Sequence, residues 1–120
     1  MNPIDATSSL RPSAIVAATV FVMLFAGHTA AQPVDAAAAE ALAKKSKCTT
    51  CHTVDKKKDG PSYQEIAAKY KGKADAGQKL FLHMTTSPKV KIDGKDETHD
   101  SPKSKNDAEV KNLAAWILSL

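Results

Sequence analysis

The pattern of apolar and polar positions after residue 31 predicts a mainly helical chain. Asp35 is a good helix cap, and the alanine-rich segment that follows favours a helix over Val34–Lys47, with lysines at its C-terminal end. Ser62 can cap a shorter helix that runs to Tyr70. A third helix is expected from Asp75 to Met84 or Thr85. The last helix, over Asn106–Leu120, is predicted from an apolar stripe: Val110, Leu113, Ala114, Ile117 and Leu120.

One face of the first predicted helix is unusually small. Ala37, Ala38 and Ala41 would let another helix approach closely, and we expect this face to lie at a helix crossing.

The longest segment without helical periodicity is Ser87–Lys105. Long loops inside small domains tend to be functional. Within this loop, Val90–Ile92 alternates between apolar and polar residues and is followed by Asp93-Gly94, a turn signal, so a small hairpin is expected. The sequence thus predicts three or four helices, little strand and one long loop before the last helix.

The N-terminal segment has the pattern of a secretory signal peptide. An uncharged apolar run over Ala14–Ala26 follows Arg11 and precedes the small residues of Thr29–Ala31. The run is shorter than the roughly 20 residues of a typical membrane span. We expect cleavage after Ala31, which gives a signal peptide over residues 1–31 and an exported domain over residues 32–120. The alternative is an uncleaved N-terminal anchor.

The composition shows that the exported domain has few large apolar residues with which to form a core. The chain has 17 Lys and Arg against 13 Asp and Glu, a balance typical of a soluble protein. The two cysteines are three positions apart, so a disulfide between them would stabilise the fold little. A disulfide framework, two domains and a large enzyme fold are excluded, and a bound group is expected to complete the core. The aromatic residues after residue 31 are Tyr63, Tyr70, Phe81 and Trp116.

The segment Cys48–His52 reads CTTCH, which is the attachment motif of c-type haem. On a helical turn, two thiols three residues apart lie on one face and can both reach the vinyl groups on one side of the porphyrin. His52 is then placed to turn its imidazole onto the iron. Thiol redox chemistry and a zinc site are alternatives, but the chain has neither a thioredoxin-like pattern nor a second ligand pair at zinc-site spacing.

With this motif in place, residues 32–120 resemble the small bacterial class I cytochromes c over nearly their whole length. The resemblance rests on an N-terminal helix, CTTCH, a basic loop, GPSYQEIAAKYKG and the final NLAAWILS. It implies an all-α class I cytochrome c fold around one covalent haem c, held by Cys48 and Cys51. It also implies that His52 is the proximal iron ligand and that the Pro61 carbonyl orients it. The function implied is single-electron transfer in the periplasm, without enzyme activity.

The sixth iron ligand is where the sequence departs from that family. The family usually supplies a methionine from the loop before the last helix, and Ser87–Lys105 contains none. We predict His99 as the distal ligand, because its distance from Trp116 is close to that of the family's methionine. Met84 is the main alternative, and His83, a lysine or an open site are further ones. Two histidine ligands would give a lower potential than a histidine and a methionine.

Lysines flank the haem motif on both sides, and we expect them to steer docking onto acidic redox proteins. Nucleic-acid binding is not expected. Two other functions stay open: a haem enzyme or gas or peroxide sensor with a labile sixth site, and a cytochrome subunit of a larger redox enzyme. The lysines concerned are Lys44, Lys45, Lys47, Lys56, Lys57 and Lys58.

Overall fold

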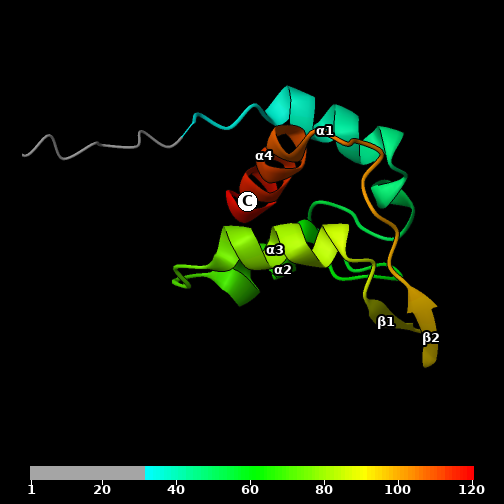
Figure 1. Ribbon diagram of the computed structural model, residues 1–120. Helices are drawn as coiled ribbons and strands as arrows, with labels where there is room; N and C mark the ends of the chain where they lie inside the picture. Colours follow the sequence, from blue (N-terminus) through cyan, green and yellow to red (C-terminus); the bar gives the residue numbers. More distant parts are fainter. Residues whose placement is uncertain (1–31) are drawn as a thin grey trace, which may run out of the picture. The chain divides into compact units, whose positions relative to one another are not determined.

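The computed structural model describes residues 32–120, and the predicted signal peptide lies outside the described residues. Four α-helices, one 3₁₀ helix and a two-stranded sheet make up this part of the chain (Figure 1). In chain order they are α1 (Ala36–Lys45), η1 (Cys48–Thr50), α2 (Tyr63–Tyr70), α3 (Ala76–Thr85), β1 (Lys89–Ile92), β2 (Lys95–Thr98) and α4 (Asp107–Leu118). Within residues 32–120, no helix has the length and apolar character needed to cross a membrane.

Side-chain caps start three of the four helices as the sequence predicts. The Asp35 carboxylate accepts the Ala38 N–H at the start of α1, and the Asn106 side chain accepts the Ala108 N–H at the start of α4. At α2, Ser62 and Glu65 form a reciprocal capping box, in which each side chain accepts the other residue's backbone N–H. These caps satisfy N–H groups that have no partner inside the helix, and they fix where each helix begins.

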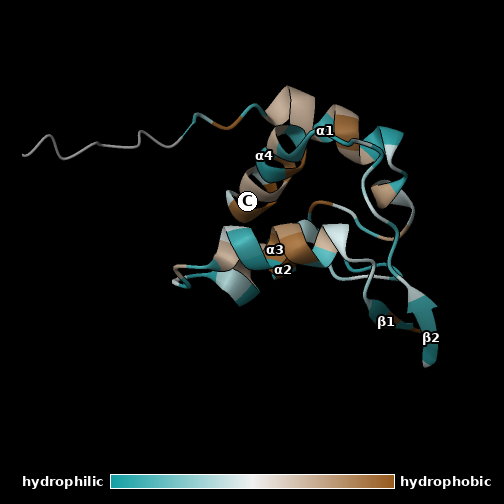
Figure 2. Cartoon of the chain, in the orientation of Figure 1, coloured by the Kyte–Doolittle hydropathy of each residue, from teal (hydrophilic) through white to brown (hydrophobic). Residues whose placement is uncertain are grey.

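Helix α4 is the centre of the fold, because α1, α2 and α3 all pack against it (Figure 1). The side chain of Asn112 on α4 bonds the Asp35 backbone twice: its Oδ1 accepts the N–H at 2.9 Å and its Nδ2 donates to the carbonyl at 2.8 Å. Hydrophobic residues occur along α1, α3 and α4, as the brown segments of Figure 2 show. The buried core consists of Ala39, Leu42, Ala43, Tyr63, Leu80, Met84, Val110, Leu113, Ala114, Trp116 and Ile117.

The face of α1 that is buried differs from the one expected at the helix crossing. Ala37, Ala38 and Ala41 are exposed, although Ala38 and Ala41 line a groove beside α4, whereas Ala39 and Ala43 are 0% and 1% exposed. Alanines occur all round this helix, so small size alone does not distinguish its inner face. Leu42 distinguishes the inner face, because it is the large apolar residue of this helix. The other buried residues, Ala39 and Ala43, lie on the same stripe as Leu42 at helical spacing.

The hairpin expected between α3 and α4 is present. Strands β1 and β2 pair antiparallel, with Lys89 opposite Thr98 and Ile92 opposite Lys95. The turn residues Asp93 and Gly94 have φ angles of 50° and 78°. Positive φ at both central residues is the type I′ geometry that matches the twist of a hairpin.

Candidate functional site: a cavity between the CTTCH turn and His99

The CTTCH segment forms a tight turn at the end of α1. Lys47, with φ of 60°, redirects the chain out of the helix, and η1 follows at once. The backbone N–H of Cys51 and that of His52 both donate to the Cys48 carbonyl, at 3.2 and 3.0 Å. This turn brings both cysteines and His52 to the wall of one cavity. The two thiols are free and half-buried, and burial raises the pKa of Cys48.

The His52 ring is held from two sides. Its Nδ1 lies 2.7 Å from the Pro61 carbonyl oxygen, and because a carbonyl only accepts, Nδ1 is the protonated nitrogen. This tautomer leaves Nε2 with its lone pair free to bind a metal. The ring also stacks on Tyr63, with centroids 5.7 Å apart and planes 19° from parallel. Burial raises the pKa of Tyr63 to about 12, so its phenol stays neutral near neutral pH.

A second histidine faces His52. The rings of His52 and His99 have centroids 6.1 Å apart, tilted by 51°. His99 follows β2 directly, and its Nδ1 is buried without a hydrogen-bond partner. Burial lowers the pKa of His99, and the neighbouring His83 and His52 add to this effect.

The two alternative ligands line the same cavity. His83 meets His99 edge-on, with centroids 4.7 Å apart, and burial lowers its pKa as well. Met84, 5% exposed, belongs to the core cluster. The fold therefore brings all three distal candidates of the sequence to one place, opposite the CTTCH turn.

The cavity has a volume of about 380 Å³ and a mainly apolar surface, with charged side chains such as Lys47, Asp59 and Lys69 also in its lining. Leu113 and Ile117 of α4 and Ile66 of α2 form part of the wall, and Val90 and Ile92 of β1 line it from the hairpin. Such a space, apolar with a few convergent polar groups, is typical of a cofactor site.

A sequence model of the cytochrome c family matches residues 36–120. The chain belongs to the cytochrome c family. Among curated relatives, the cytochrome c-551 of Stutzerimonas stutzeri is 35% identical over 99 residues, covering 82% of this chain and 92% of its own length. The cytochrome c-552 of Hydrogenobacter thermophilus is 40% identical over 84 residues, covering 68% and 80%.

Solved structures show the same fold. The class 1 cytochrome MtoD from Sideroxydans lithotrophicus ES-1 is 48% identical, with a TM-score of 0.70 over 72% of this chain and 97% of that protein. Cytochrome c552 of Nitrosomonas europaea gives 36% identity and a TM-score of 0.57, over 68% and 98%. The chain is thus a small class I monohaem cytochrome c, an electron carrier and not an enzyme, and its cofactor is one covalent haem c.

The cavity of this cytochrome fits that group in its chemistry. Two free thiols, three residues apart in the sequence, line the cavity with an imidazole whose Nδ1 is already hydrogen-bonded to a carbonyl. The His52 and His99 rings both line this cavity, with centroids 6.1 Å apart, and imidazole nitrogen is a ligand that suits iron.

Sequence reasoning missed the role of Gly60. A Cβ on this residue would lie 2.6 Å from His52 Cε1, closer than real atoms approach. The glycine is what allows the Gly60-Pro61 segment to pass directly beside the imidazole. The Gly60-Pro61 pair was the only signal for this role in the sequence. Such a pair predicts a turn, but it does not predict that the backbone passes close to the His52 ring.

We expect Gly60→Ala to displace the His52 ring and to lower the free energy of unfolding by about 1 kcal/mol. The added methyl must push either the ring or the Pro61 carbonyl aside, which weakens their hydrogen bond. Electron paramagnetic resonance of the ferric protein and denaturant unfolding measure the two effects. Gly77→Ala is the matched control, because its added methyl meets nothing within 4 Å and it lies on α3. Unchanged resonance in Gly60→Ala would contradict the argument.

Proposed function

We propose that this protein is a periplasmic electron carrier whose haem iron has two histidine ligands. Cys48 and Cys51 form the thioether bonds, His52 is the proximal ligand and His99 is the distal one. The observation that supports this best is the pair of facing imidazoles, 6.1 Å apart across the cavity. A signal peptide over residues 1–31, cleaved after Ala31, provides the export that thioether attachment in the periplasm requires.

Each side chain has a separate task. The bound haem supplies a one-electron change of iron valence. The Pro61 carbonyl accepts a hydrogen bond from His52 Nδ1–H. This bond orients the ring and makes the imidazole a stronger ligand to a metal. Tyr63 fixes the plane of that ring by stacking. The apolar part of the wall, with Leu113 and Ile117 of α4, would shield one side of the bound group from water, which tunes the potential.

His99 is preferred to Met84 because of where the two side chains lie. Met84 is part of the packed core between α3 and α4, which suits contact with the flat face of a cofactor. His99 extends from the end of the hairpin, and its ring lies 6.1 Å from that of His52, tilted by 51°. A histidine in place of the family's methionine lowers the potential, so we place this carrier below the high-potential cytochromes.

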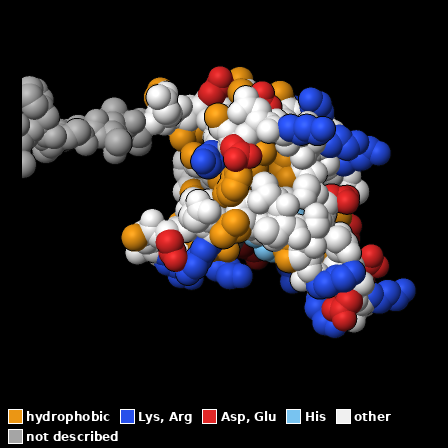
Figure 3. Space-filling model, in the orientation of Figure 1, with side chains coloured by type: hydrophobic (Ala, Val, Ile, Leu, Met, Phe, Trp, Pro, Cys, Tyr) orange, Lys and Arg blue, Asp and Glu red, His pale blue; other side chains and the backbone are white. Residues whose placement is uncertain are grey.

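The partners we propose are redox proteins with acidic surfaces. The six lysines that flank the CTTCH segment are all exposed. Within residues 32–120 the structure contains two ion pairs, Lys79–Asp75 and Lys91–Asp96, and neither uses these lysines. Lys side chains gather over the end of α1 in Figure 3 and again over the hairpin. Their charge is therefore free to raise the rate of encounter with an acidic protein.

Near-infrared magnetic circular dichroism of the ferric protein tests the ligand assignment. We expect a bis-histidine band in the wild type that is lost in His99→Ala and kept in Met84→Ala and His83→Ala. We also expect the midpoint potential to rise in a His99→Met variant that acquires methionine ligation. A histidine–methionine band that disappears only in Met84→Ala would overturn the assignment. Loss of the band only in His83→Ala would overturn it as well.

A further inference from the structure

The hairpin of β1 and β2 presents one side to the cavity. Along β1, exposed Lys89 and Lys91 alternate with half-buried Val90 and Ile92, and the hairpin lines the cavity through Val90, Lys91, Ile92 and Thr98. All four residues of β2 are exposed, and Figure 2 shows this strand as hydrophilic. Strand β2 thus has no buried side chain of its own. Its position, and that of His99 just after it, depends on its pairing with β1.

The base of the hairpin is closed on both sides of His99. The His99 backbone N–H donates to the Pro88 carbonyl at 2.9 Å, which extends the ladder by one position beyond Thr98. The hydroxyls of Ser87 and Ser101 lie 2.9 Å apart, a hydrogen bond that joins the two strands at the hairpin's root. The backbone of His99 is therefore held by the hairpin and not by a helix.

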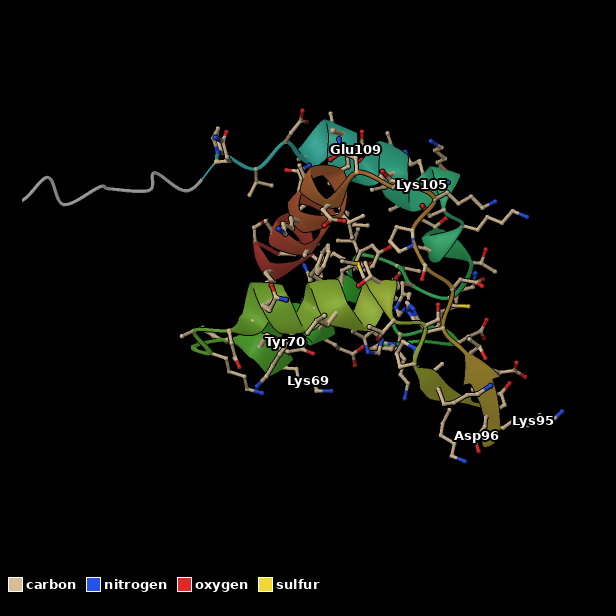
Figure 4. The ribbon with its side chains drawn as sticks, in the orientation of Figure 1. Lys69, Tyr70, Lys95, Asp96, Lys105 and Glu109 are labelled. Atoms are coloured by element: carbon tan, nitrogen blue, oxygen red, sulfur yellow. The ribbon has the colours of Figure 1, made fainter. Side chains whose placement is uncertain are left out.

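The far end of the hairpin is set by its turn. Gly94 has φ of 78°, and a Cβ added there would meet no atom within 4 Å. A substitution at Gly94 therefore acts through the backbone conformation alone. Figure 4 shows Lys95 and Asp96 beside this turn, pointing away from the helices.

We propose that this hairpin, residues 87–101, is a clamp that sets how long His99 stays on the iron, so that hairpin opening controls the access of external ligands. The inference rests on His99 being the distal ligand, as proposed above. Isolated two-stranded hairpins are marginally stable, and local segments of this kind open without global unfolding. When the ladder opens, the His99 N–H leaves Pro88 and the imidazole leaves with its backbone.

Cyanide binding to the ferric holoprotein, followed by stopped flow, tests the clamp. Gly94→Val places a β-branched residue in left-handed backbone, which disfavours the turn. We expect cyanide to bind to Gly94→Val about 5- to 30-fold faster than to the wild type. This factor corresponds to the cost of placing a residue with a Cβ in left-handed backbone. Gly94→Asn is the matched variant, because asparagine adopts this conformation far more readily, and its rate should stay close to wild type.

Hydrogen exchange gives a readout that does not depend on the iron. The amide proton of His99, bonded to Pro88, should exchange faster in Gly94→Val by a similar factor, while core amides of α4 keep their protection. Ser101→Ala leaves the turn intact and weakens only the root of the hairpin. It should give a smaller increase in both rates.

The same series separates failure of the clamp from failure of the ligand assignment. In His99→Ala, cyanide should bind fast, and adding Gly94→Val should change nothing more. If His99→Ala binds no faster than wild type, His99 is not the ligand and the proposed function fails. If His99→Ala is fast but Gly94→Val matches the wild type, the clamp is refuted. If Gly94→Val accelerates binding equally in both backgrounds, the hairpin merely covers the cavity mouth, and the clamp is again refuted.

Discussion

The double variant Cys48→Ala/Cys51→Ala is expected to lose all covalently bound haem. Both sulfurs lie on the one turn that lines the cavity, and no other cysteine exists in the sequence. A haem stain after denaturing electrophoresis measures this directly, since only thioether-bound haem survives denaturation. Either single variant should keep haem through one bond, with a shifted pyridine haemochrome band.

The same variant is expected to lose most of its stability. The cavity of about 380 Å³ borders the core residues Leu80, Met84, Leu113 and Ile117, which would lose their contacts with the bound group. In domains of roughly this size the core alone rarely supplies more than about 3–5 kcal/mol. The whole stability of a small domain is about 5–15 kcal/mol. We therefore expect the far-ultraviolet circular dichroism of the helices to be largely lost.

Thr49→Ala and Thr50→Ala are the matched controls for this pair. Both threonines lie in the same turn, and both are exposed. These variants should retain the haem stain and the helical signal of the wild type. Haem that remains attached to the double variant on a denaturing gel would contradict the assignment of the two thiols.

Local chemistry made most of the fold predictable. The caps at Asp35, Ser62 and Asn106 are short-range signals, and each helix begins within two residues of its expected start. The hairpin followed from Asp93-Gly94, a pair that adopts positive φ at low cost. The type of each element depends on a few neighbouring residues, and these are visible in the sequence.

The distal half of the site was less predictable, for a physical reason. The CTTCH segment places its groups within one turn, so its geometry follows from the spacing alone. His83 and Met84 lie on α3 and His99 follows β2, and the fold brings all three to the cavity. Spacing could name these candidates, but only the facing rings of His52 and His99 favour one of them. The close approach at Gly60 likewise depends on two segments that meet in space.

The buried face of α1 leads to the second large effect. Ala39→Leu is expected to lower the free energy of unfolding by about 1–3 kcal/mol, the usual cost of forcing extra methylenes into a packed core. Ala39 is fully buried, and its helix packs against α4. For a domain of this size, each kcal/mol corresponds to about 4–8 °C in Tm. Guanidinium unfolding of the holoprotein, followed by the fluorescence of Trp116, measures the loss.

Ala41→Leu is the control, since it makes the same change two residues away at an exposed position on the open groove between α1 and α4. Leucine and alanine are both good helix formers, so this variant should unfold close to wild type. Both variants change helix propensity equally, so a difference between their free energies of unfolding measures the packing at Ala39 alone. Equal losses in both variants would mean that Ala41 also lies against another part of the protein. A loss in Ala41→Leu alone would mean that α1 meets α4 through the face first expected from the sequence.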